Sequence, residues 1–182
     1  MAPPLDDSWT LPLPLEPEAE GWSHEIANPV SDRACLVRPG EMTTHTDTAE
    51  IVALIERVDL AYRTKDADAV AAAYAPDAVM FDLAPPLAMA FDRTKLAEWF
   101  ATWDGPLEHT WQDRRIRVSG DLGVCTALLQ TRATKQGERA EFWIRCSLVF
   151  ARGKDGWKVV HEHSSVPFHM DGSYRAATDL KP

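Results

Sequence analysis

Cysteine is scarce in this chain. Its 182 residues include three cysteines, Cys35, Cys125 and Cys146, and no two of them have the spacing of metal ligands. An odd number of cysteines without a secretory signal is typical of reduced thiols in a cytoplasmic protein, which is the location we expect. The simplest role for Cys125 and Cys146 is that of small buried hydrophobic residues.

Runs of basic residues and long apolar stretches are missing as well. The formal charge is −9 at pH 7, whereas nucleic-acid-binding proteins gather lysine and arginine on one surface. No stretch is long and apolar enough to span a bilayer, and the N-terminus lacks the basic and apolar regions of a signal peptide. We therefore expect neither a nucleic-acid nor a membrane partner. No cofactor-binding motif is visible, so we also expect no cofactor.

The composition changes sharply near residue 42. Residues 1–41 hold seven of the 13 prolines, and their two arginines and eight carboxylates give them a net charge of about −6. Such a segment does not favour regular structure, although Trp9 and Trp22 could dock on a neighbouring surface. We predict an acidic, proline-rich arm over 1–41, one folded domain over 42–170 and a C-terminal tail over 171–182.

Three stretches after this arm have the features of helices. Asp47 begins an apolar stripe of period 3.6 that predicts a helix to about Lys65. Asp66 is placed to cap a second, short helix that ends before Pro76. Asp92 is placed to cap a third helix that ends before Gly105-Pro106.

The rest of the chain has the pattern of strands separated by short turns. The stretch "AVMFDL" follows the second helix, and four longer segments, "HTWQDRRIRV", "GVCTALLQTRA", "AEFWIRCSLVF" and "WKVVHEHSS", follow the third. The turn clusters between those four segments are spaced as in an antiparallel meander. Helices followed by such a sheet predict an α+β fold, in which three helices pack on a strongly curved antiparallel sheet and enclose a pocket.

This order of elements, together with "AYAPDAVMFD" and "DGWKVVHEHSSVP", resembles the NTF2-like superfamily over roughly 47–168. The groups it resembles are the SnoaL-like and ketosteroid-isomerase-like proteins and the association domain of the calcium/calmodulin-dependent kinases. The resemblance implies the fold of a cone, whereas proteins with this cone serve many functions.

Asp82 is the sharpest chemical feature that the resemblance provides. In ketosteroid isomerases a Tyr-Ala-x-Asp-Ala run precedes an aspartate that moves a proton between carbons, and the run from Tyr74 to Ala78 places Asp82 on that base. At the mouth of an apolar pocket, desolvation would raise the pKa of such a carboxyl group towards that of a useful base. The alternative is an aspartate that caps the turn before Pro85-Pro86.

The hydrogen-bond donor of those isomerases is not matched. The tyrosine that binds the substrate's oxyanion would fall on Val58 of this sequence. Tyr62 lies one turn further along the same helical face and is the substitute we expect, with a core position as the alternative.

His161 and His163 are separated by one residue on the last strand. Alternation along a strand would place both on the same face as Trp157 and Val159. The His-x-His-x-Ser pattern of the kinase association domain matches them and Ser165, which implies that all three line the cavity. Three interpretations stay open: core histidines, acid-base or ligand-binding histidines, and a metal pair. Because no third ligand is fixed nearby, we predict no metal site.

Three further residues are candidates for ligand binding. Arg145 would bind a carboxylate if it faced the pocket, or cover the outer sheet face if it did not. Trp99 and Trp103 would close the helical side of the pocket, or belong to the core.

The sequence thus predicts a protein that binds a small apolar organic ligand. Isomerase or lyase chemistry on a carbonyl-type compound is the activity we expect if it is an enzyme, with Asp82, His163, His161 and Tyr62 as catalytic candidates. A non-catalytic ligand-binding or oligomerisation domain is the alternative. Apolar residues on both faces of the central strands predict a homodimer through the sheet.

Overall fold

The computed structural model describes residues 41–182 of the chain. The predicted arm, with Trp9, Trp22 and Cys35, lies outside the described residues apart from Glu41. The described helices are α1 Glu41–Thr64, α2 Ala67–Ala73 and α3 Arg93–Ala101.

Helix α1 begins six residues before the position that the sequence predicts. The predicted cap, Asp47, lies inside the helix, is 5% exposed and forms an ion pair with Arg152. An aspartate near the start of an apolar stripe has the pattern of a cap, but here tertiary pairing with a distant arginine accounts for it.

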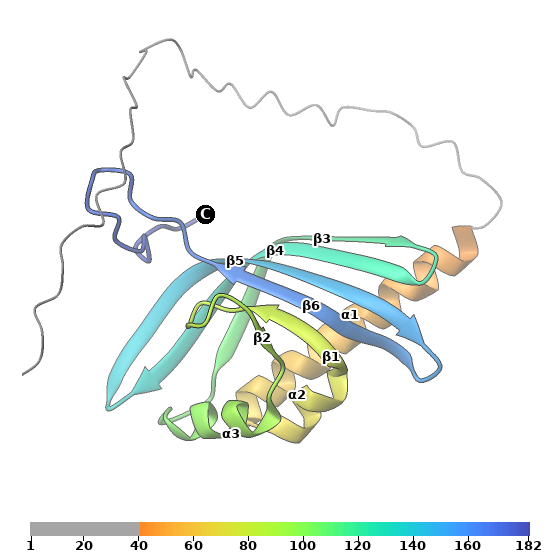
Figure 1. Ribbon diagram of the computed structural model, residues 1–182, viewed down its shortest axis with the longest axis horizontal. Coiled ribbons are helices and arrows are strands. Elements are labelled where there is room, and N and C mark those ends of the chain that lie inside the picture. Colours follow the sequence, from red (N-terminus) through yellow and green to blue (C-terminus); the bar gives the residue numbers. More distant parts are fainter. Residues whose placement is uncertain (1–40) are drawn as a thin grey trace, which may run out of the picture. The chain divides into compact units, whose positions relative to one another are not determined.

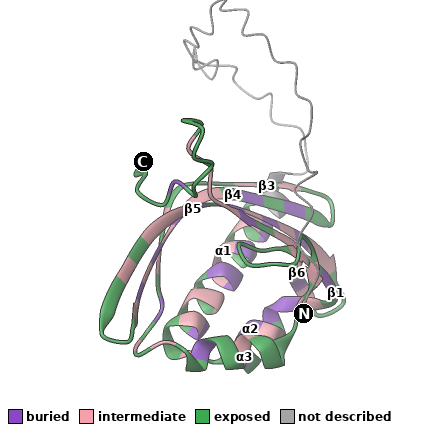
Figure 2. Ribbon diagram, turned by 60° about the vertical axis from the view of Figure 1, so that its left-hand side comes forward, coloured by how far each residue is buried: buried purple, intermediate pink, exposed green. Residues whose placement is uncertain are grey.

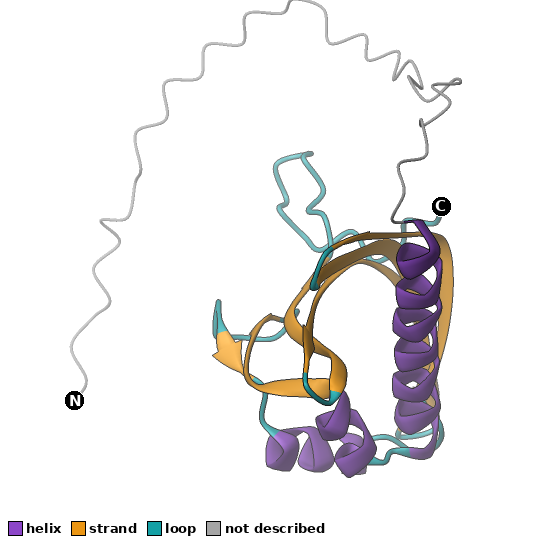
Figure 3. Cartoon of the chain, turned by 90° about the vertical axis from the view of Figure 1, so that its right-hand side faces the viewer, coloured by secondary structure: helices purple, strands orange, loops and turns teal. Residues whose placement is uncertain are grey.

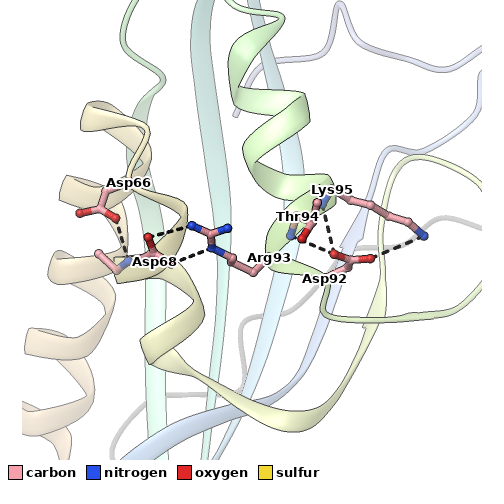
Figure 4. A network of polar contacts seen from close by, with 7 residues as sticks. Asp66, Asp68, Asp92, Arg93, Thr94 and Lys95 are labelled. Atoms are coloured by element: carbon pink, nitrogen blue, oxygen red, sulfur yellow. Dashed lines mark hydrogen bonds and ion pairs between the residues drawn. The ribbon is translucent and has the colours of Figure 1, made fainter.

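The predicted caps of the two short helices are confirmed. Asp66 accepts a hydrogen bond from the backbone N–H of Ala69, and Asp92 accepts bonds from the first turn of α3 (Figure 4). Arg93 then joins α3 to α2 through two contacts with Asp68, at 2.6 and 2.9 Å. Both partners are exposed, so this pair adds little stability.

The six strands form one sheet in the order β2-β1-β6-β5-β4-β3 (Figure 1). The strands are β1 Tyr74–Phe81, β2 Met89–Ala90, β3 Glu108–Ser119, β4 Leu122–Lys135, β5 Glu138–Gly153 and β6 Gly156–Ser165. The antiparallel meander of β3 to β6 is confirmed. Strand β1, however, pairs parallel to β6, so the sheet is mixed and not wholly antiparallel. Local patterns do not show this pairing, because its partners are about 80 residues apart.

The sheet is strongly bent, and α1 lies along its concave side (Figure 3). Two irregularities in the ladder contribute to the bend. Strand β3 has an extra residue at Asp113–Arg114, where Asp113 has a φ of +54°, and β6 has one at Val160. Such bulges increase the local twist of a strand and bend it.

The core is built from residues of all three helices and of the sheet, and its buried residues are purple in Figure 2. Its most deeply buried large side chains are Ile51, Val70, Phe100, Leu107, Phe150 and Val159. Gly123 in β4 permits the close approach of α1, because a Cβ atom there would lie 2.6 Å from Cδ1 of Ile51. The expected α+β architecture of helices on a curved sheet is confirmed. Within residues 41–182, no helix combines the length and hydrophobicity that a membrane crossing needs.

Candidate functional site

The bulge in β6 decides which side chains face the interior. Phe150 of β5 pairs with Val159, whereas the adjacent Val149 pairs with His161, so Val160 is an extra residue. One extra residue reverses the alternation of the faces beyond it. Val159 faces the interior, and beyond the bulge Glu162 takes that face. The prediction that His161, His163 and Ser165 line the cavity is therefore wrong.

The two imidazoles lie instead on the outer face of the sheet, beside β1. Nδ1 of His161 is 2.8 Å from the backbone oxygen of Val79. The ring of Phe81 meets both imidazoles edge-on, with centroid distances of 4.8 Å to His161 and 5.8 Å to His163. His163 is exposed. This arrangement explains the His-x-His pattern as a cross-strand aromatic cluster.

A pocket lies between α1 and the concave face of the sheet. Its atom-free volume, counted with its opening to solvent, is about 440 Å³, and its interior is narrow. The lining residues are Leu54, Ile55, Val58, Asp59, Tyr62, Tyr74, His109, Trp111, Leu129, Cys146, Leu148, Phe150, Val159 and Glu162. The wall is mostly apolar, with two groups of polar side chains, as is typical of sites for small organic molecules.

The first polar group is centred on Asp59 of α1. Its Oδ2 accepts a hydrogen bond from Nε1 of Trp111 at 2.6 Å, and its Oδ1 lies 3.1 Å from Nδ1 of His109. A carboxylate can only accept, so Nδ1 carries the proton and Nε2 of a neutral His109 is left as an acceptor. Nε2 has no hydrogen-bond partner among the described residues. The histidine is thus held in the tautomer of a base.

The second polar group is centred on Glu162 of β6. The hydroxyl of Tyr74 donates to its Oε2, and Oγ of Ser164 donates to its Oε1 at 3.2 Å. Burial raises the pKa of Glu162, the Asp82 carboxylate raises it further, and the bond from Tyr74 opposes both. A carboxyl group with a raised pKa keeps its proton to higher pH and then has an O–H to donate.

Tyr62 of α1 contributes a hydroxyl to the same pocket. Its ring packs against His109 at a centroid distance of 4.8 Å and against Phe100 at 5.3 Å. The hydroxyl has no hydrogen-bond partner among the described residues. Burial, followed by the nearby Glu162, raises the pKa of Tyr62 well above its ordinary value, so the group remains a donor. Tyr62 thus lines the pocket beside Val58 of the same helix.

Asp82 lies just beyond the end of β1 and is exposed. Its Oδ1 accepts a hydrogen bond from the backbone N–H of Leu83 at 2.6 Å, as a turn-capping aspartate does. It does not line the pocket, and neither do His161 and His163. Its charge still contributes to the raised pKa of Glu162 and of Tyr62.

The other ligand-binding candidates do not line the pocket. Arg145 is exposed, and it pairs with Ser165 across the outer face of the sheet. Trp99 and Trp103 form an edge-to-face pair 5.7 Å apart, and Trp99 is 40% exposed. The helical wall of the pocket comes from α1 and not from α3, because the longer helix lies along the sheet.

The cysteines that the structure describes behave as buried hydrophobic residues. Cys125 and Cys146 are free thiols, 1% and 4% exposed. Burial raises the pKa of Cys125 to about 11 and that of Cys146 further. Across the described part of the chain, no three histidine, cysteine or carboxylate side chains gather as metal ligands would.

Sequence reasoning missed most of the polar residues of the pocket. One signal was available for Asp59, because a carboxylate follows Val58 on the buried stripe of α1. A second was the alternation of His109 and Trp111 on one strand face. No signal was available for Glu162, because nothing in "WKVVHEHSS" marks the position of the bulge.

Comparison with known proteins identifies the family. The family model of the SnoaL-like domain matches residues 51–169 of this sequence. The chain belongs to the SnoaL-like family. No curated protein matches it. Among solved structures, the SnoaL-like chain is similar to an NTF2-like protein of unknown function from Pseudomonas putida KT2440. The two are 29% identical with a TM-score of 0.66, and the match covers 76% of this chain and 99% of that one.

Two more distant structures show the likeness in fold alone. A proposed dehydratase of the NTF2-like family from Streptomyces avermitilis is 16% identical over 67% of this chain and 97% of that one, with a TM-score of 0.59. The CaMKII hub of S. rosetta is 20% identical over 64% of this chain and 94% of that one, with a TM-score of 0.53. The resemblance to NTF2-like proteins that the sequence indicated is confirmed.

Proposed function

We propose that this SnoaL-like protein binds a small, largely apolar carbonyl compound and transfers a proton on it, as an isomerase or a lyase does. One observation carries the proposal: the Asp59–His109 pair and the Tyr74–Glu162 pair line the same narrow pocket. A base and an acid on one cavity are the equipment of general acid-base catalysis.

In this proposal His109 is the base. The carboxylate of Asp59 holds its ring by Nδ1, which directs the lone pair of Nε2 towards a C–H bond next to the ligand's carbonyl group. Asp59 also stabilises the imidazolium that forms, as the aspartate of a Ser-His-Asp triad does. Trp111 acts as a positioning residue, because its indole N–H fixes the second oxygen of Asp59.

Tyr62 and Glu162 are the donors. Removal of the proton places negative charge on the carbonyl oxygen, and preorganised O–H groups in a water-poor site stabilise that charge. Both side chains have raised pKa values, chiefly through burial, so both keep their protons to higher pH than exposed groups would. A lyase would use the same donors to protonate a leaving hydroxyl group.

Asp82 has an indirect role in this account. Its carboxylate raises the pKa of Glu162 from outside the pocket, and so favours the protonated donor. The resemblance to ketosteroid isomerases implied that Asp82 is the base. In our proposal the base is His109. A proposed dehydratase among the structural relatives fits lyase chemistry on this fold.

Binding is the first experiment. The purified full-length chain is analysed by native mass spectrometry for retained small molecules, and then titrated with small ketones while tryptophan fluorescence is followed. We expect a ketone to alter the fluorescence of the native protein, and a Val58→Trp substitution that fills the pocket to abolish the change. A ketone that binds both proteins equally does not occupy this pocket.

Assembly is the second candidate function. The outer face of the sheet carries large apolar side chains that are still 40–44% exposed, Val79, Phe81 and Val124. A homodimer through this face would cover them. The CaMKII hub among the structural relatives favours assembly as a use of this fold. Light scattering at micromolar concentration tests it, and a monomer would count against a dimer through the sheet.

A further inference from the structure

A second cavity shares the Asp59–His109 pair with the apolar pocket. It is an open cleft with an atom-free volume of about 430 Å³, between the end of α1 and the first residues of β3. Its lining consists of Asp59, Arg63, Leu107, Glu108, His109 and Arg132. Asp59 and His109 therefore belong to the walls of both the apolar pocket and this cleft.

The two arginines of the cleft differ in their partners. Arg132 lies 3.5 Å from the carboxylate of Glu108 and donates to Oγ1 of Thr110 at 3.2 Å, so its contact with Glu108 is long. Arg63 is exposed and forms no hydrogen bond or ion pair with any described residue. It follows Asp59 by one helical turn, which places both on the same side of α1.

Both carboxylates of the cleft have partners among the described residues, whereas one of its two arginines has none. The carboxylate of Asp59 is engaged by His109 and Trp111, and that of Glu108 by Arg132. The guanidinium of Arg63 is left over. An arginine without a partner next to a histidine held as a base is placed to receive an anion, and carboxylates suit the planar guanidinium best.

We propose that this cleft binds a carboxylate group of the ligand through Arg63 and Arg132, so that the substrates of the SnoaL-like protein are small oxo acids. The inference rests on the proposed function, because it assigns the reacting carbonyl group to His109 and the carboxylate to the cleft that His109 also lines. Glu108 competes for Arg132, and the ligand carboxylate takes over that contact.

A matched pair of probes separates the carboxylate from the rest of the ligand. The probes are 4-oxopentanoate and its uncharged methyl ester, and dissociation constants come from NMR chemical shifts of the full-length chain. We expect the acid to bind about tenfold more tightly than the ester, since one charge-assisted hydrogen-bond pair is lost in the ester. The preference should shrink as salt is added.

Two variants locate the contact. Arg63→Gln should lose the preference for the acid, whereas Arg57→Gln should keep it, because Arg57 lies on the same helix but lines a different groove. Equal binding of acid and ester by the native chain would overturn the inference, and so would an Arg63→Gln variant that behaves like Arg57→Gln. Failure of both probes to bind would also overturn it.

These experiments distinguish a failure of the cleft assignment from a failure of the proposed function. If the ester binds as well as the acid and a Val58→Trp substitution blocks both, the pocket is a ligand site but the cleft does not recognise carboxylates. If the acid is preferred through Arg63 but no proton transfer occurs, the cleft assignment stands and the catalytic proposal fails.

Discussion

The indole Nε1 of Trp111 and the carboxylate of Asp59 are 2.6 Å apart, across the interface of β3 and α1. The bond joins the strand that carries His109 to the helix that carries Tyr62. It fixes one carboxylate oxygen, so the other is presented to Nδ1 of His109 at 3.1 Å. A structural contact between helix and sheet thereby determines the tautomer of a pocket histidine.

The first prediction concerns Asp59→Asn. An asparagine can still accept the bond from Trp111 through its oxygen, and its NH₂ group then faces Nδ1 of His109. Nδ1 becomes an acceptor and the ring proton moves to Nε2, which can no longer act as a base. We expect proton-transfer activity to fall by roughly 10²- to 10⁴-fold.

Nitrogen-15 NMR of the imidazole checks this prediction directly. The native chain should show the tautomer protonated on Nδ1, and Asp59→Asn the other one. Asp68→Asn is the matched control, because Asp68 pairs with Arg93 on the exposed side of α2. An unchanged tautomer in Asp59→Asn would mean that Asp59 does not orient the ring.

The second prediction is a pH dependence of folding stability that originates at Glu162. Its pKa is raised in the folded state, chiefly by burial, so the folded protein binds this proton more tightly than the unfolded chain. The contribution to stability is complete below the unfolded pKa and is lost as pH rises through the folded pKa. The melting temperature of the native chain should therefore fall as pH rises across that window.

Glu162→Gln should remove this part of the pH dependence, because glutamine does not titrate. The melting temperatures of native and variant protein are compared at a series of pH values between acid and neutral. Parallel curves for the two proteins would show that Glu162 is not a source of the pH dependence.

The third prediction concerns Asp82→Asn. Asparagine can still accept the bond from the N–H of Leu83, so stability should change by no more than about 0.5 kcal/mol. Removal of the charge should lower the pKa of Glu162, although burial will keep it above the ordinary value. Carbon-13 NMR of the glutamate carboxyl group gives that pKa. A Glu162 pKa that does not move would show that the two groups are uncoupled.

The fourth prediction concerns the two histidines of β6. Because they lie on the outer face, His161→Gln and His163→Gln should leave ligand affinity in the pocket unchanged within about twofold. His161→Gln should also cost about 1 kcal/mol of stability, the usual value of a hydrogen bond such as the one to Val79. Affinity lost in either variant would place these histidines at the ligand after all.

The sequence predicts the elements of this fold better than it predicts the site. Capping by Asp66 and Asp92 is a local effect, so their positions determine where α2 and α3 begin. The site depends on a single extra residue, Val160, which exchanges His161 for Glu162 on the interior face. Bulges arise from how strands pair across the sheet, and no local pattern in β6 marks one.

Asp59 shows the opposite case, in which a local signal was present. An acidic residue beside the buried stripe of a helix needs hydrogen-bond partners, and a strand with His109 and Trp111 on one face supplies them. Only the packing of α1 against β3 shows that these three residues meet.

The central claim is that His109 is the base of a proton-transfer site. Its most direct test is the exchange of α-protons for deuterons in D₂O, measured by proton NMR on 4-oxopentanoate and on a simple ketone. Breaking the C–H bond transfers the proton to Nε2 of His109, and a deuteron returns to carbon after the imidazole exchanges with solvent. We predict that the native chain accelerates the exchange for at least one compound and that His109→Gln loses roughly 10²-fold or more of the acceleration. A native chain that binds these compounds without accelerating exchange, or a His109→Gln variant as active as the native chain, would contradict the account.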